Sequence, residues 1–121
     1  MRYTDDEVEA LLPLPGATFH ILVALAREED RHGYAIMQEV EERTSGKLRL
    51  SAGTLYRSIG RLLEQGLIFE TTEHRAGEPD DERRRYYRIT PFGSAVARAE
   101  ARRLAQLLAM ARSQGVVPGK A

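Results

Sequence analysis

Apolar side chains recur at helical spacing in residues 51–64, and polar side chains fill the positions between them. The apolar positions are Leu55, Ile59, Leu62 and Leu63. The polar positions are Ser51, Thr54, Tyr56, Arg57, Ser58 and Arg61. Ser51 is of a type that caps helix starts, and Gly66 is of a type that follows helix ends. The pattern therefore predicts a helix with one buried face and one basic, hydroxyl-rich face.

Three patterns before this stretch also predict helices. Thr4 and Glu7 are spaced as a capping box, which opens a short helix. The segment 17–29 is apolar on nearly every side, so we expect this helix in the core or in a subunit interface. A third helix is expected over 34–44, after a polar turn at 28–33.

The pattern changes after Gly66, where β-branched and aromatic residues become frequent. The segments 67–74 and 84–90 predict two strands, and the Gly, Pro and Asp residues between them predict the long tip of a β-hairpin. Arginines near the tip are expected either to bind phosphate or to neutralise the acidic groups beside them. Tyr86 and Tyr87 point to opposite faces of a strand. We therefore expect one in the core and the other free to contact phosphate or a partner.

Thr90 and Pro91 are suited to cap and open a last helix over 91–113. Its seam of positions at steps of four and three residues is Ala97, Ala101, Leu104, Leu108 and Ala111. Because three of these five are alanine, the seam alone is too weak to hold two chains. The apolar helix that contains Phe19 and Leu22 needs cover as well, so we expect both helices to pack against their copies in a homodimer. The alternative is a monomer whose last helix folds back on its own core.

The order of these elements is that of a winged helix-turn-helix. The expected fold is mainly α-helical with a small β-hairpin, followed by a C-terminal dimerisation helix. The expected parts are a short helix and connector (1–14), the winged helix-turn-helix domain (15–90), the dimerisation helix (91–113) and a flexible tail (114–121). In this fold the helix over 51–64 enters the major groove of DNA, and the hairpin reaches the backbone or the minor groove.

The composition fits one soluble globular domain, with 121 residues, 42% hydrophobic and 30% charged. The formal net charge is zero, which argues against a nonspecific binder of polyanions. Basic residues nevertheless gather between residues 43 and 66, Lys47 among them, and a local field of this kind steers ligands. An acidic N-terminus without a signal-peptide core, and no apolar run long enough to span a membrane, indicate a cytoplasmic protein.

Candidate chemistry for an enzyme is missing from the sequence. The absence of cysteine excludes disulfides and cysteine-ligated zinc. His20, His32 and His74 are isolated, and no common nucleophile, dinucleotide or phosphate-loop motif occurs. We therefore assign no catalytic residue, metal site or cofactor. The remaining alternative to DNA binding is a winged-helix module that binds another protein, which the zero net charge permits.

Several short motifs occur in order between residues 17 and 95. They are Gly33-Tyr34, Thr44-Ser45-Gly46, Gly53-Thr54-Leu55-Tyr56, Gly66-Leu67-Ile68 and the run from Tyr86 to Gly93. With these motifs the chain resembles the PadR family of transcriptional regulators. The single short last helix resembles the compact subgroup of that family.

The resemblance implies a dimeric winged-helix protein that binds DNA, usually a repressor that a small molecule releases. The positions that match the DNA contacts of the family are Tyr34, Thr54, Tyr56 and Arg57, with Arg84, Arg85 and Tyr87 in the wing. Lys47, Ser51 and Arg61 complete our set of candidates for DNA contact. Two copies would present two recognition helices about one DNA turn apart, roughly 34 Å, so a roughly palindromic double-stranded operator is expected.

The effector that such a repressor answers to is expected to be a small hydrophobic or aromatic molecule. Phe19, Phe92 and Met110 either line an apolar cavity for it or belong to the core. The sequence leaves these two interpretations open.

Overall fold

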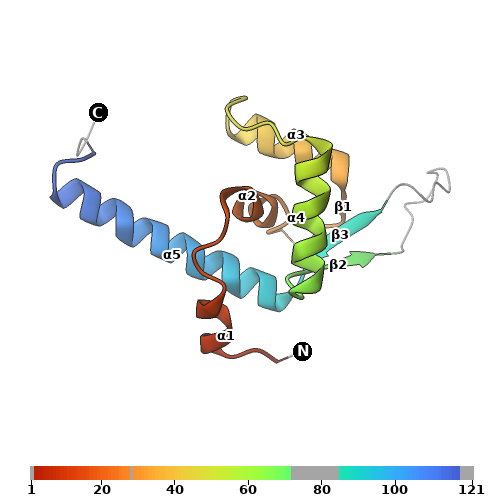
Figure 1. The fold of residues 1–121 in the computed structure, drawn as a ribbon, viewed down its shortest axis with the longest axis horizontal. Coiled ribbons are helices and arrows are strands. Elements are labelled where there is room, and N and C mark those ends of the chain that lie inside the picture. Colours follow the sequence, from red (N-terminus) through yellow and green to blue (C-terminus); the bar gives the residue numbers. More distant parts are fainter. Residues whose placement is uncertain (1, 28, 72–84, 118–121) are drawn as a thin grey trace.

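The computed structural model describes residues 2–27, 29–71 and 85–117. Its elements in chain order are α1 (Asp5–Ala10), α2 (Gly16–Ala24), β1 (Arg31–His32), α3 (Gly33–Arg43), α4 (Ala52–Glu64), β2 (Ile68–Thr71), β3 (Tyr86–Ile89) and α5 (Pro91–Ser113). Figure 1 shows α2, α3 and α4 gathered beside a small sheet, while the second half of α5 extends away from this body. The expected class, mainly helical with a small antiparallel sheet, is confirmed.

Side-chain caps begin the helices where the sequence places capping residues. The Thr4 hydroxyl accepts from the Glu7 N–H at 3.1 Å, and the Glu7 carboxylate accepts from the Thr4 N–H at 3.1 Å, which completes the capping box. Ser51 Oγ accepts from the Thr54 N–H at 3.1 Å at the start of α4. The Thr90 hydroxyl caps α5 in the same way. These bonds satisfy amides that a helix leaves unpaired in its first turn.

The sheet has three strands rather than the two of the expected hairpin. Their order is β1-β3-β2, and both pairs are antiparallel. The hairpin register sets Ile68 opposite Ile89, and β1 adds His32 opposite Tyr86. The expected polar turn at 28–33 is therefore partly wrong, because Arg31 and His32 are extended and pair with β3. The expected hairpin tip lies outside the described residues.

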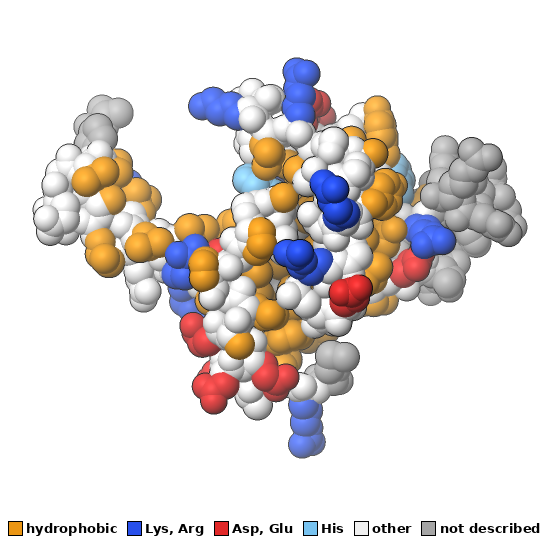
Figure 2. Space-filling view, viewed as in Figure 1, with side chains coloured by type: hydrophobic (Ala, Val, Ile, Leu, Met, Phe, Trp, Pro, Cys, Tyr) orange, Lys and Arg blue, Asp and Glu red, His pale blue; other side chains and the backbone are white. Residues whose placement is uncertain are grey.

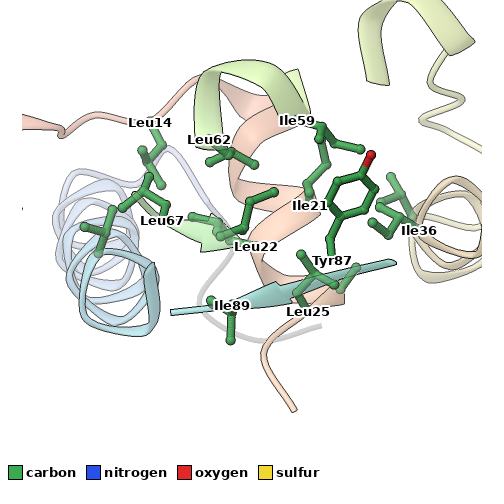
Figure 3. Close-up of a cluster of buried hydrophobic side chains, with 14 of the residues drawn as sticks. Leu14, Ile21, Leu22, Leu25, Ile36, Ile59, Leu62, Leu67, Tyr87 and Ile89 are labelled. Carbon is green, nitrogen blue, oxygen red and sulfur yellow. The ribbon is translucent and has the colours of Figure 1, made fainter. Parts of the chain in front are cut away.

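The core lies between α2, α3, α4, the first half of α5 and the sheet (Figure 3). Its fully buried side chains include Ile21, Leu22, Leu25, Ile36, Leu55, Ile59, Leu62 and Leu67. Helix α2 is apolar on nearly every side; Ile21 and Leu22 are fully buried, whereas Val23 is 37% exposed. Each large side chain buried in the core contributes about 1.5–3 kcal/mol. This packing fixes the position of α4, whose opposite face stays exposed.

Two expectations about these helices are corrected. Helix α2 ends at Ala24 rather than continuing to residue 29, because the Leu25 N–H already bonds in a tightened last turn. The chain must then become extended to form β1. Leu63 was expected in the buried face of α4, but it is 36% exposed at the edge of that face.

The N-terminal segment packs along α5. The Tyr3 ring lies 5.4 Å from the Phe92 ring, and the Leu14 N–H donates to Glu100 Oε2 at 2.8 Å. Glu100 is 2% exposed and also pairs with Arg103. The Arg103 guanidinium, followed by the Leu14 N–H, lowers the pKa of the Glu100 carboxyl against the opposing effect of burial. The buried carboxylate of Glu100 therefore links the connector before α2 to α5 through a hydrogen bond.

Candidate nucleic-acid interface

The exposed face of α4 carries the polar side chains that the sequence pattern places there. Tyr56 is 51% exposed, and Arg57 and Arg61 are exposed beside it. Figure 2 shows basic side chains on the surface where Figure 1 places α4. The Ser51 hydroxyl donates to Thr54 Oγ1 at 3.0 Å, which orients both hydroxyls at the first turn of the helix. The hydroxyl and guanidinium groups of this face can therefore donate hydrogen bonds to a bound partner.

A glycine of α3 brings Tyr56 close to the start of that helix. A Cβ at Gly33 would lie 2.7 Å from Tyr56 Oη, so any larger residue would displace the phenol. Tyr34 follows directly and is 62% exposed. His32 begins α3 by accepting a hydrogen bond from the Ala35 N–H at 3.2 Å on Nδ1. Sequence reasoning missed this cap, because histidine is not among the usual capping residues.

The turn between α3 and α4 holds the next candidate, Lys47. Ser45 and Gly46 have positive φ angles of 53° and 76°, and the Thr44 hydroxyl accepts from the Leu48 N–H at 3.0 Å. Lys47 is exposed and makes no ion pair within the described part of the chain. The turn therefore presents a free ammonium group next to the N-terminus of α4.

Arginine charge is distributed unevenly over the surface. Six described arginines pair with carboxylates: Arg31 with Glu29 and Glu39, Arg43 with Glu39, Arg49 with Glu41, Arg85 with Glu70, Arg88 with Asp30 and Arg103 with Glu100. Arg57 and Arg61 of α4 have no such partner among residues 2–27, 29–71 and 85–117. The formal net charge of zero thus coexists with an un-neutralised basic face on α4.

The wing candidates are only partly placed. Arg84 lies outside the described residues, and Arg85 is exposed with its guanidinium 3.3 Å from Glu70. The expectation that one of Tyr86 and Tyr87 is free is wrong, because they are 4% and 3% exposed. Their strand β3 is the central one, so His32 of β1 packs against Tyr86, while Tyr87 points into the core (Figure 3).

Burial changes the part that Tyr87 can play. Desolvation is the main cause that raises the pKa of its phenol, and the nearby Glu70 adds to the effect. The ring lies among Ile21, Ile36 and Ile59 in the view of Figure 3. Tyr87 therefore supports the surface of α4 from behind and does not lie on the exposed face where we expected it to contact DNA.

The candidate dimer seam is only partly exposed. Leu22 is fully buried within the chain, so the expectation that it pairs two chains is wrong. Phe19, Ala97 and Ala111 are half-buried, whereas Ala101, Leu104 and Leu108 are exposed. The structure adds Leu107 and Met110, which are 44% and 60% exposed. Leu107 lies three residues after Leu104, so its helical spacing was a signal that the strict heptad steps left out.

Other kinds of site find little support in the described residues. Nowhere in that part of the chain do three His, Asp or Glu side chains group as metal ligands. None of its helices is long and apolar enough to cross a membrane. Phe92 is buried in the core, while Met110 is exposed on α5, so within one chain these two do not line a common cavity.

Comparison with known proteins places the chain among transcriptional regulators. Residues 21–99 match the transcriptional regulator PadR-like family. An uncharacterised protein of Lysinibacillus sphaericus is 38% identical over 75 residues, which cover 62% of this chain and 66% of that protein, just under two thirds of its length.

Two solved structures share the fold. A PadR-like transcriptional regulator from Bacillus cereus superposes with a TM-score of 0.68 at 18% identity, over 94% of this chain and all of that one (100%). A transcriptional regulator from Clostridium thermocellum gives a TM-score of 0.67 at 22% identity, over 93% and 97% of the two chains. At such low identity these structures establish the shared fold.

Proposed function

Because the chain belongs to the PadR-like family of transcriptional regulators, we propose that it is a homodimeric repressor that binds a roughly palindromic double-stranded operator. A small hydrophobic or aromatic effector would release it, and the protein would act in the cytoplasm without catalysis or cofactor. The single observation that carries the proposal is the exposed, un-neutralised basic face of α4. A helix of 13 residues with this face fits the major groove.

The chemistry of α4 and its surroundings supports contact with a duplex. Arginine pairs bidentately with guanine or phosphate, and hydroxyls suit phosphates or base edges. Tyr34, Tyr56 and Lys47 surround the N-terminal half of α4, the half that reads base edges in helix-turn-helix proteins. Arg85 would extend the contact toward the wing once it exchanges Glu70 for a phosphate.

The second half of α5 supports the homodimer. Leu104, Leu107 and Leu108 are 39–44% exposed on one stripe of a helix that leaves the body of the chain (Figures 1 and 2). A symmetric partner that carries the same stripe would cover these side chains. A cavity for an effector would then form between the two chains, with Phe19 and Met110 from each at its border.

A direct test is titration of the protein against a labelled fragment of the promoter beside its gene and against a shuffled fragment of equal length, each at two salt concentrations. We expect tighter binding to the promoter fragment. Affinity should fall with a log–log slope of roughly −0.9 per phosphate neutralised. Equal affinity for both fragments, or no retardation at all, would contradict operator recognition and favour the protein-binding module that the zero net charge permits.

A further inference from the structure

A groove of about 170 Å³ lies between the start of α2 and the exposed side of α4. Its lining residues are Pro15, Ala17, Thr18, Thr54, Arg57, Ser58 and Arg61. The sequence pattern indicates no contact with DNA for Ala17 and Thr18, the residues of α2 in this set. The groove therefore joins the recognition helix to an element that was expected to serve only the core or a dimer interface.

The first side of the groove is the N-terminus of α2. This helix begins at Gly16, and its N-cap Pro15 has no side chain that accepts a hydrogen bond. No described residue accepts a hydrogen bond from the first-turn amides of α2, which lie at the positive end of the helix dipole.

Thr18 supplies an independent indication of a ligand. Thr18 is only 3% exposed, yet its hydroxyl bonds to no described residue. The hydroxyls of Thr44 and Thr90, by comparison, each donate to a backbone carbonyl. Thr18 lines the groove, where its hydroxyl can donate a hydrogen bond to a ligand. An acceptor atom in the groove would satisfy this hydroxyl.

The second side of the groove is formed by α4. Arg57 and Arg61 are one helical turn apart, so both guanidinium groups lie on the same face, and neither pairs with a carboxylate of the described chain. Thr54 and Ser58 add hydroxyls between them. The groove contains no acidic side chain, so all of its charge is positive. This combination of amides, hydroxyls and guanidinium groups is the chemistry that binds phosphate.

We propose that this groove holds one phosphate of the DNA backbone. Arg61, together with Thr18 and the first-turn amides of α2, then fixes α4 in the major groove, and Arg57 contributes to the same phosphate instead of reading a base. The inference rests on the proposed function, because a duplex in contact with α4 is what brings a phosphate to this place. Phosphate contacts set the register of a protein on DNA and carry no sequence information.

Three variants test the assignment on the promoter fragment and its shuffled control. Arg61→Gln should weaken binding to both duplexes by the same factor, about tenfold, and should lower the salt slope by roughly 0.9. Thr18→Val should weaken binding to both by about three- to tenfold and leave the salt slope unchanged, because it removes a hydroxyl and no charge. Its melting temperature should stay the same or rise. Arg27→Gln removes an exposed charge beyond the other end of α2 and should leave the slope unchanged.

The outcomes separate this inference from the proposed function. If the wild type prefers the promoter fragment but Arg61→Gln and Thr18→Val bind as tightly, the groove holds no phosphate and the inference fails alone. If Arg61→Gln abolishes the preference for the promoter fragment, Arg61 reads a base and the inference is overturned. If the wild type binds neither duplex, both proposals fail.

A second measurement distinguishes a backbone phosphate from a soluble one. The DNA-free protein is titrated with inorganic phosphate while the amide resonances of Gly16, Ala17 and Thr18 are followed by NMR. A backbone site predicts shifts only at millimolar phosphate, and these shifts should disappear in Arg61→Gln. Saturation at micromolar phosphate would assign the groove to a soluble phosphate ligand and overturn the proposal of a DNA contact.

Discussion

Replacing Leu107 and Leu108 by glutamate should convert the protein from a dimer to a monomer. Complete burial of a leucine contributes about 1.5–3 kcal/mol, so covering the roughly two fifths that remain exposed is worth about 0.6–1.2 kcal/mol per side chain. With Leu104, a symmetric pair of chains would cover six such side chains, for a gross gain of about 4–7 kcal/mol. The double substitution removes four of these six and places four carboxylates in an apolar contact.

The assay is sedimentation velocity at micromolar chain concentration, with circular dichroism to verify that the variant keeps its helices. The matched control is Ala109→Glu, which adds a carboxylate to an exposed position on the opposite side of α5 and should leave the mass at two chains. A dimeric mass for the double variant would show that the leucine stripe does not hold the chains together. A monomeric wild type would refute the pairing itself.

Three further predictions concern the fold. Gly93→Ala should lower the free energy of unfolding by about 1–3 kcal/mol in a urea titration, because its Cβ would lie 2.0 Å from the Leu67 carbonyl oxygen. An unchanged free energy of unfolding would contradict this close contact. Gly60→Ala should raise that free energy by up to about 1 kcal/mol, since its Cβ meets only open space, and a decrease would contradict the geometry. The carboxyl of Glu100 has a lower pKa in the folded protein than in the unfolded chain. Its charge therefore stabilises the folded protein at pH values above the pKa of the unfolded chain. This stabilisation is lost as the pH falls through the pKa of the folded protein. Thermal melts of Glu100→Gln should therefore depend less on pH in this acidic range than those of the wild type, and parallel pH profiles would contradict the assignment.

Local signals explain which elements could be predicted from the sequence. The caps Thr4, Ser51 and Thr90 bond within three residues, so the chain around each of them determines the geometry. The stripe of α4 also follows from helical spacing, and only Leu63 at its edge was misplaced. Most of the exposed face of α4 was accordingly predictable residue by residue.

Features that depend on distant contacts could not be predicted in this way. Strand β1 is two residues long and has no periodicity, so only its pairing with β3 reveals it. That pairing makes β3 central and helps to bury Tyr86, against the prediction that one of the two adjacent tyrosines is free. Because α2 is apolar on nearly every side, its sequence does not show which side faces the core and which could face a second chain. Leu22 was therefore wrongly assigned to the dimer interface. The sequence around Glu100 does not distinguish it from a surface residue of a helix, because the Leu14 N–H that bonds to it lies far away in the chain.

In the proposed complex, two copies of α4 read one duplex. Its most direct test is a footprint of the wild type on the promoter fragment, combined with the mass of the complex. We expect two protected half-sites about one helical turn apart, roughly 34 Å, and two chains per duplex. A single protected segment with one chain bound, or protection that does not depend on sequence, would contradict this arrangement.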